Sequence, residues 1–308
     1  MQTEFNLDPN LLENGRRISP KRFSAYFSEK IKFDTNVLNT GEGTSVTASK
    51  KESVIFEFEG FLKNDFIIKK KFIVSPEFRI NYSKYSKNDA SVYQNDSYSL
   101  FFNLKNKYEH LIKNKPSSFI FDIEYSKINK DYNQIHKREP YSKSLNFTIG
   151  ESFNLFNFGE TNFKLKRKST TGTNELISNK TTTISMDQSL VLKNQNLLIG
   201  MFEYNSIDVF NDPTTSTNNI TNRLDYIILN LIPTYTVGLA LTTTFTDTKE
   251  MKTSRGTEIT LNPTFDISKE ISDKTKIGFT YDFSKNISKS EDYKYTKHLF
   301  FLEFRYSY

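Results

Sequence analysis

The sequence predicts an all-β fold in which about fourteen antiparallel strands close into one up-and-down barrel. Three observations predict it. Apolar and polar residues alternate strictly in the last strand, several strands exceed ten residues, and short connections alternate with long ones along the chain. Successive residues of a strand point to opposite faces of a sheet. Alternation of apolar and polar residues therefore indicates strands with one apolar face and one polar face.

The clearest alternation lies in the last twelve residues of the chain. The even positions carry apolar or aromatic side chains, namely Phe300, Leu302, Phe304, Tyr306 and Tyr308. The odd positions between them carry the polar side chains Glu303, Arg305 and Ser307. This strand therefore has one aromatic face and one charged face, and it ends on an aromatic residue.

The remaining strands follow from similar alternation upstream. We expect them near 21–33, 52–63, 66–86, 97–109, 117–130, 141–156, 159–170, 180–193, 196–210, 221–234, 236–249, 256–269, 274–286 and 293–308. A soluble β-sandwich also alternates, but its strands usually have about five or six residues. A tilted strand needs about nine to eleven residues to cross a bilayer. Strand length therefore favours a transmembrane barrel, in which Phe121, Leu241, Leu261 and Phe279 face lipid.

Connections of two lengths alternate along the chain. Tight links are expected at 63–65, 194–196 and 272–273. Longer polar loops are expected near 34–51, 87–96, 131–140, 171–179, 211–220, 250–255 and 287–292. Short turns at one end and long loops at the other are the pattern of transmembrane β-barrels.

Together, the alternation, the loop asymmetry and the aromatic terminal strand resemble bacterial outer-membrane β-barrels over residues 21–308. The resemblance implies an outer-membrane location, short periplasmic turns with both termini on that side, and contact with outer-membrane lipid and lipopolysaccharide. It also implies assembly by the barrel-insertion machinery, with Phe300, Leu302, Phe304, Tyr306 and Tyr308 as the insertion signal. Fourteen-stranded members include monomeric porins and channels for hydrophobic substrates of the long-chain fatty-acid transporter type. No motif of either subfamily is visible in this sequence.

Composition agrees with this interpretation. The chain has 308 residues with 28 Phe, 17 Tyr, no Trp and no Cys, and its mean hydropathy is −0.58. It contains no apolar run long enough for a membrane helix. A net charge of +6 is spread among interleaved acids, so we expect no nucleic-acid partner. The start Met1–Glu4 lacks the basic and apolar regions of a signal peptide. We therefore expect a mature exported chain with an added Met.

Tyrosines are expected to supply the interfacial belts of the barrel, because the ring prefers lipid and the hydroxyl prefers the headgroups. On the outward parity, those expected near the outer ends are Tyr82, Tyr98, Tyr125, Tyr204, Tyr226 and Tyr281. Tyr306 and Tyr308 are expected near the inner end.

The first twenty residues form a separate segment. Asp8 as N-cap, Pro9 at the first helical position and Gly15 as the stop predict one or two helical turns. This segment could plug the barrel or dock a periplasmic partner. A loosely ordered terminus is an equally good interpretation.

Some residues fit the barrel pattern less well. Pro76 and Pro263 fall inside predicted strands, and each removes a ladder donor, so we expect bulges there. Glu151 falls on an outward position, which indicates a bulge or register shift. In 223–234 the residues that point to either face are apolar. We favour packing against the lumen wall there over a contact between protomers.

No catalytic group, metal site or cofactor motif is expected. The histidines are His110 near an inner turn, His136 in an outer loop and His298 on the lipid parity of the last strand. They cannot meet in a Ser-His-acid arrangement. We therefore expect a protein that is not an enzyme.

The inward parity carries charges of both signs on adjacent strands. The candidates for lining the lumen and setting ion selectivity are Lys105, Lys107, Asp122, Glu124, Lys164, Lys166, Lys168, Asp187, Glu303 and Arg305. Opposite charges at similar depth should form cross-strand pairs. Other inward charges are Lys30, Lys32, Glu57, Glu59, Lys71, Glu77, Arg79 and Asp282, the last expected beside Glu303 and Arg305. The sequence favours a porin-like channel for small solutes. The alternative is a non-transporting barrel that scaffolds an envelope protein complex through its loops or N-terminal segment.

Overall fold

The computed structural model describes residues 22–39, 52–68, 71–154, 159–173, 177–192, 194–229, 232–250 and 255–308. The strands are β1 (Phe23–Asp34), β2 (Ser53–Asn64), β3 (Phe66–Ile68), β4 (Phe72–Tyr85), β5 (Ser97–Ile112), β6 (Lys115–Lys130), β7 (Glu139–Asn154), β8 (Glu160–Gly172), β9 (Asn179–Val191), β10 (Leu197–Val209), β11 (Thr217–Leu229), β12 (Tyr235–Thr248), β13 (Glu258–Ser272), β14 (Thr275–Ile287) and β15 (Tyr295–Ser307). A helical turn α1 (Ala90–Tyr93) and the 3-10 turns η2 (Pro213–Thr215) and η3 (Glu291–Tyr293) complete the described elements. None of the helices in these ranges is long and apolar enough to cross a membrane.

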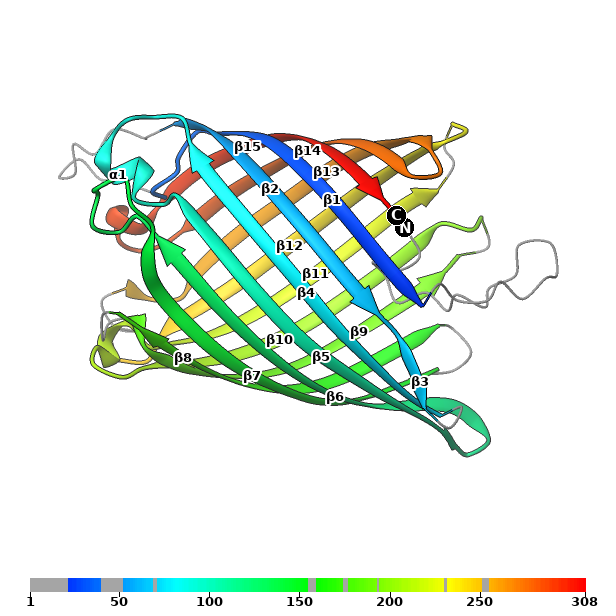
Figure 1. The fold of residues 1–308 in the computed structure, drawn as a ribbon. Coiled ribbons are helices and arrows are strands. Elements are labelled where there is room, and N and C mark those ends of the chain that lie inside the picture. The colour runs from blue at the N-terminus through cyan, green and yellow to red at the C-terminus, as the bar shows by residue number, and fades with distance from the viewer. Residues whose placement is uncertain are drawn as a thin grey trace.

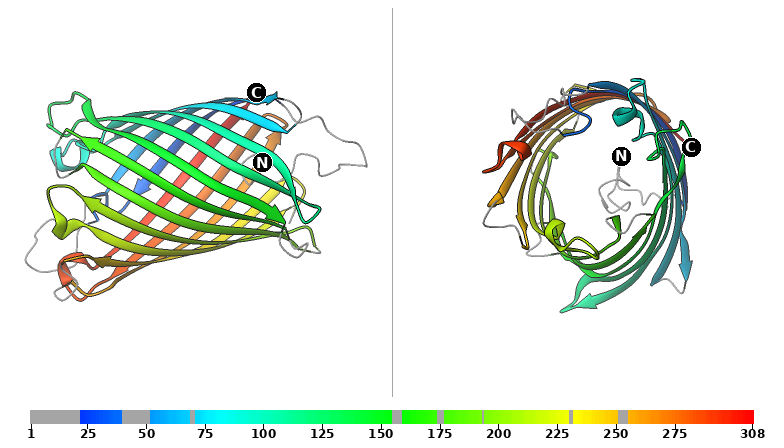
Figure 2. Two further views of the ribbon diagram at one scale, coloured as in Figure 1. Left: turned by 90° about the horizontal axis from the view of Figure 1, so that it is seen from below. Right: turned by 90° about the vertical axis from the view of Figure 1, so that its left-hand side faces the viewer.

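The strands form one closed antiparallel barrel (Figures 1 and 2). β1 pairs with β2 on one side and with β15 on the other, where Tyr26 lies opposite Ser307. β2 in turn pairs with β4, which completes the ring. β3 pairs only with the start of β4, in the same register as β2, so the barrel wall has fourteen strands. The sequence prediction of a closed barrel of about fourteen strands is confirmed.

The hairpin formed by β2, β3 and β4 differs from the sequence prediction. We expected a tight turn at 63–65, but Phe66 lies opposite Val74 and Ile68 lies opposite Phe72. The chain therefore reverses between 68 and 72, and β3 extends β2 beyond a one-residue interruption at Asp65. The backbone N–H of Asp65 donates to the carbonyl of Arg22 over 2.6 Å. The polar Asn64-Asp65 pair is thus an interruption within an extended hairpin and not a turn.

The two strand prolines do not cause bulges, contrary to expectation. Pro76 lies opposite Leu104 of β5, and the ladder on its other side is interrupted between β2 and β3 without a change of register. Pro263 lies opposite Leu241, and the β13–β14 register is the same on both sides of it. A missing N–H thus removes ladder hydrogen bonds while the alternation of faces is kept.

Glu151 lies in a regular part of the β6–β7 ladder, opposite Phe119, so the bulge or shift expected there is also absent. Its carboxylate lies 3.2 Å from His110 Nε2 and accepts a hydrogen bond from the Ser117 hydroxyl. Outward placement is tolerated because the carboxylate has polar partners and lies near the turn end, the end of the barrel where the connections between strands are short. The opposite end, with the long connections, is the loop end.

β11 begins and ends about four residues earlier than predicted, at Thr217–Leu229 instead of 221–234. Its polar first residues continue the ladder with β12, where Thr217 lies opposite Thr248. Tyr226 consequently lies near the turn end, not the loop end, and its hydroxyl accepts a hydrogen bond from Asn196. The inward Ile227 is buried opposite Leu197, which agrees with packing against the lumen wall.

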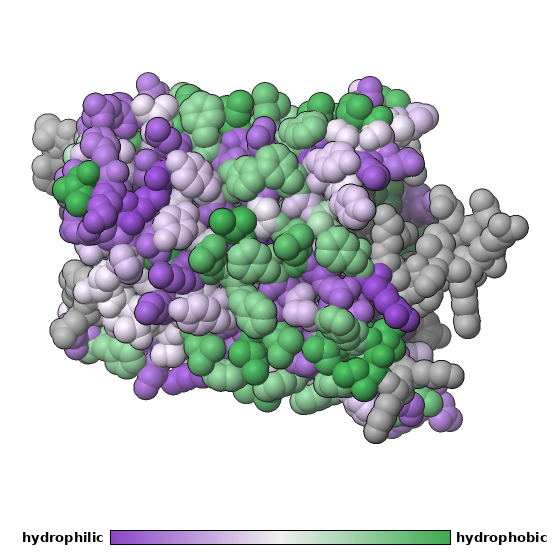
Figure 3. Space-filling view, viewed as in Figure 1, coloured by the Kyte–Doolittle hydropathy of each residue, from purple (hydrophilic) through white to green (hydrophobic). Residues whose placement is uncertain are grey.

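The barrel is apolar outside and polar inside. Among the described residues, 43 large apolar or tyrosine side chains are exposed, and five apolar side chains are buried. The buried residues are mostly Ser, Thr and Asn. Figure 3 shows apolar side chains over the middle of the barrel and mainly polar ones at the end that carries α1. A soluble protein of this size does not expose so much apolar surface, whereas a transmembrane barrel requires it.

The connections are short at the end where β1 begins and β15 ends, and long at the other end. Two long loops contact each other above the rim. Tyr93 stacks on His136 with ring centroids 4.2 Å apart, and its hydroxyl donates to the carbonyl of Gln134. Arg138 lies 3.3 Å from Asp96 and 3.1 Å from the Tyr82 hydroxyl. The loop asymmetry expected from the sequence is therefore present, whereas the expected segment 1–20 lies outside the described residues.

Candidate functional site: the charged lumen wall

The terminal strand places its aromatic and apolar face outward. Leu302 is 55% exposed, and Phe300, Phe304, Tyr306 and Tyr308 are also exposed on the same parity. The N–H of Tyr308 donates to the carbonyl of Ala25 over 2.9 Å, so pairing with β1 continues to the last residue. The five residues proposed as an insertion signal therefore form one continuous outward row.

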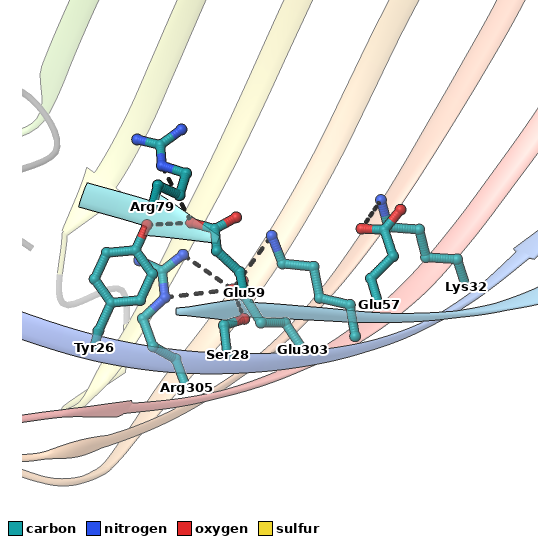
Figure 4. A network of polar contacts seen from close by, with 9 residues as sticks. Tyr26, Ser28, Lys32, Glu57, Glu59, Arg79, Glu303 and Arg305 are labelled. Carbon is teal, nitrogen blue, oxygen red and sulfur yellow. Dashed lines mark hydrogen bonds and ion pairs between the residues drawn. The ribbon is translucent and has the colours of Figure 1, made fainter. Parts of the chain in front are cut away.

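The inward faces of β15, β1, β2 and β4 carry a network of paired charges (Figure 4). Its centre is Glu303, which accepts from Ser28 Oγ over 2.6 Å and from Arg305 Nη2 over 2.9 Å. Lys30 Nζ lies 3.5 Å from the same carboxylate oxygen. One carboxylate is thus held by three groups from two neighbouring strands.

The network extends along β1 and across β2. Lys32 and Glu57 form an ion pair of 2.7 Å. The Tyr26 hydroxyl donates to Glu59, and Arg79 Nε lies 3.9 Å from Glu59. Between these side chains lies a recess of about 190 Å³ whose lining includes Lys30, Glu57, Glu59, Asn81, Ser83, Ser97 and Ser99.

A second group of charges lies on β5 and β6. Lys105 is directly opposite Asp122, yet its ammonium group pairs with Glu77 of β4 over 3.0 Å. Asp122 instead accepts a hydrogen bond from the N–H of Asn106. Lys107 lies 3.9 Å from Glu109 of its own strand, and Glu124 forms no ion pair with any described residue. Lys105 and Asp122 are therefore opposite each other, as expected from adjacent strands, but the ammonium group forms its ion pair with a third strand.

The three lysines of β8 behave differently from one another. Lys164 pairs with Asp187 of β9 over 3.5 Å, as expected from adjacent strands. Lys166 reaches Glu203 of β10 at 4.0 Å. Lys168 forms no ion pair within the described part of the chain. The row is thus partly neutralised at its turn end and most positive toward its loop end.

Carboxylates concentrate on the other side of the barrel. Asp225 of β11, Asp266 of β13 and Asp282 of β14 all lie on the inward parity. Arg223 is within this group and binds Asp225 over 2.7 Å. Asp282 lies opposite Leu299 and accepts from Thr264, so it is not beside Glu303 and Arg305 as the sequence suggested. The small residues Gly238 and Ala240 face the lumen on β12, between β11 and β13.

The histidines lie far apart along the barrel. His110 is at the turn end, whereas His136 lies in a long loop and His298 contacts the Tyr281 hydroxyl at 2.9 Å near the loop end. The described residues contain no group of three or more His, Cys, Asp or Glu that could hold a metal ion.

Sequence analysis did not name Glu29, a charged residue on the outward face. Glu29 is exposed on β1 between the outward Phe27 and Ile31. Following the directly opposite residues from strand to strand gives the height of Glu29. Across β2, β4 and β5 they connect Glu29 with Asn129, which lies at the loop end of β6. In the other direction, four steps lead to Tyr235 at the turn end of β12. Glu29 therefore lies about halfway up the barrel. The parity of β1 would have revealed it, because Lys30 and Lys32 had already been placed inward.

No family model and no curated protein matches the sequence. Solved structures match the fold. An anion-selective porin from Comamonas acidovorans has a TM-score of 0.50 at 9% identity, covering 93% of this chain and 98% of that one. OmpT of Vibrio cholerae in its trimer form has a TM-score of 0.48 at 8% identity, covering 93% and 98%. An outer-membrane channel from Pseudomonas putida F1 has a TM-score of 0.46 at 9% identity, covering 96% and 100%.

At such identities the likeness shows the fold alone. The fold, the closed ladder and the apolar outer surface together describe a β-barrel of the bacterial outer-membrane type.

Proposed function

We propose that this outer-membrane barrel is a channel that passes small polar solutes through a lumen of mixed charge. The observation that carries the proposal is the polar, ion-paired interior of a fourteen-stranded barrel. About eight strands make a barrel that side chains alone can fill. A wider barrel lined by hydrated charged groups leaves room for water between its walls.

The arrangement of charge supports passage of solutes that are polar and carry little net charge. Lys164, Lys166 and Lys168 lie on β8, and the carboxylates Asp225, Asp266 and Asp282 lie on β11, β13 and β14. Opposite charges on separate walls set up a field across the lumen, and charged rings or rows set ion preference. Because the two groups partly cancel, we expect only a weak preference for anions.

Conductance of the purified protein in planar bilayers tests the proposal. The chain contains no Cys, so a single introduced thiol can be labelled selectively. Thr242 faces the lumen on β12, and its neighbour Leu241 is 51% exposed on the outward face. A charged, water-soluble thiol reagent should lower the conductance of Thr242→Cys and leave that of Leu241→Cys unchanged.

Two results would contradict the proposal. Equal effects on both variants would mean that the inward face does not line the conducting path. Absence of conductance after verified insertion would favour the non-transporting scaffold.

A further inference from the structure

The outward faces of β6 and β7 change from apolar to basic residues at the same pair of opposite positions. On β6 the outward residues Phe119, Phe121 and Tyr125 are exposed, and on β7 so are Leu145 and Phe147. Tyr125 lies opposite Leu145, which is the last apolar pair toward the loop end. The next outward pair is Lys127 opposite Lys143. Two lysines therefore mark the edge of the apolar band on the side of the long loops.

This pairing places two like charges side by side. Directly opposite residues of an antiparallel pair have Cβ atoms about 5 Å apart, and like charges there are destabilising. Within the described residues, no carboxylate forms an ion pair or hydrogen bond with either ammonium group. The hydroxyl-bearing Thr171 of β8 lies opposite Lys143. An anion bound between the two lysines would remove the repulsion.

Three other outward basic residues toward the loop end have partners. Arg167 of β8 donates to the Thr182 hydroxyl. Lys180 of β9 lies opposite Asp208, and its ammonium group lies 5.2 Å from the centroid of the Phe210 ring. Lys249 pairs with the same Asp208. Lys127 and Lys143, in contrast, lie directly opposite each other and have no such partner among the described residues.

We propose that Lys127 and Lys143 bind a phosphate group of the glycolipid in the outer leaflet. Long loops lie on the external side of such barrels. The pair therefore lies where acyl chains end and charged headgroups begin. A lipid fits better than a free anion, because its chains would cover the exposed Phe119, Phe121, Leu145 and Phe147 directly below the pair. The outer-leaflet glycolipid carries phosphates at that depth, which matches the two ammonium groups in charge and position.

The test is titration of the folded barrel in detergent with lipid A bearing two phosphates, with bound lipid counted by native mass spectrometry. Lys127→Gln/Lys143→Gln should weaken binding roughly thirtyfold, the effect of two lysines near a charged membrane surface. The matched control is Lys269→Gln/Lys285→Gln, which removes two outward lysines from β13 and β14. That control should change binding less than about threefold, because neither lysine has a second lysine opposite it. Lys269 lies opposite Tyr235 and Ile277, and Lys285 lies opposite Leu261 and Thr296.

Further measurements distinguish a lipid phosphate from free phosphate. They also show whether a loss of binding comes from the lysines or from a misfolded barrel. Dephosphorylated lipid A should bind the parent as weakly as bisphosphorylated lipid A binds the double variant. K143E should abolish lipid binding without lowering the barrel's thermal stability, because Lys127 then faces a carboxylate. Undiminished binding by the double variant, or an equal loss in the control, would overturn the proposal. Inorganic phosphate competing as well as the lipid would show a general anion site and would also overturn it.

Discussion

The side-chain amide of Asn262 donates to the backbone carbonyl of Phe283 over 2.7 Å. The β13–β14 ladder lacks the pairs 262–284 and 263–283, both of which require an N–H at residue 263. Pro263 cannot supply it, so the neighbouring amide takes its place. This substitution explains why a proline is accommodated without a bulge.

Asn262→Ala should therefore destabilise the barrel by about 1–2 kcal/mol, because it leaves the Phe283 carbonyl without a donor. In the background Pro263→Val the same change should cost much less, since the backbone N–H is restored. Refolding titrations of the four proteins in lipid vesicles measure the coupling. Equal costs in both backgrounds would mean that Asn262 does not replace the proline's missing donor.

The terminal strand should be indispensable for closure. Deleting residues 304–308 removes the partners of Tyr26 to Glu29 on β1 and exposes an unpaired edge. Unpaired backbone groups in lipid cost several kcal/mol each. We expect no heat-modifiable folded band on gel electrophoresis after vesicle insertion. A truncated chain that inserts and resists protease like the parent would contradict this.

Adjacent residues on β14 provide a test of which face meets lipid. Phe279 lies on the outward parity with the exposed Ile277, and Thr280 lies on the inward parity. Phe279→Arg should lower barrel stability by roughly 2–4 kcal/mol, because the charge enters the lipid band. Thr280→Arg should be mild, since it faces the lumen. Similar penalties for the two variants would show that the assignment of faces is wrong.

Glu29 should weaken the isolated barrel in lipid. Its carboxylate lies about halfway up the outward face, opposite the apolar Phe58 and Phe304. Glu29→Leu should raise the free energy of unfolding in vesicles by roughly 1–2 kcal/mol, less than an equivalent arginine would change it. Glu29→Gln should give an intermediate value. A loss of stability in Glu29→Leu would mean that a polar contact holds this carboxylate in the assembled barrel.

The lysine row of β8 should influence ion preference in the proposed channel. Changing Lys164, Lys166 and Lys168 to Glu should shift the reversal potential in a salt gradient toward cations. The largest part of the shift should come from Lys168, because Lys164 and Lys166 already have carboxylate partners. A suitable control is Arg167→Glu on the same strand, which faces outward and should leave the reversal potential unchanged. An unmoved reversal potential in the triple variant would place the row outside the conducting path.

The architecture of this protein could be predicted from local patterns in the sequence. Alternation with a period of two specifies which residues share a face, and it does so locally, without knowledge of neighbouring strands. This is why the fold class, most strand ranges and the outward row Phe300–Tyr308 could be predicted. The lengths of the polar segments similarly gave the two unlike ends of the barrel, since a tight antiparallel hairpin needs only about two to five residues.

The pairing of individual charges could not be predicted in this way. Lys105 faces two candidate carboxylates on different strands and pairs with Glu77, not with the directly opposite Asp122. The stagger between strands, the strand tilt and the side-chain rotamers decide this choice, and alternation contains none of them. The depth of Glu29 and the juxtaposition of Lys127 with Lys143 have the same origin. The face to which a residue points is a local property of its strand. Its cross-strand neighbours and its height in the barrel depend on pairing with segments elsewhere in the chain.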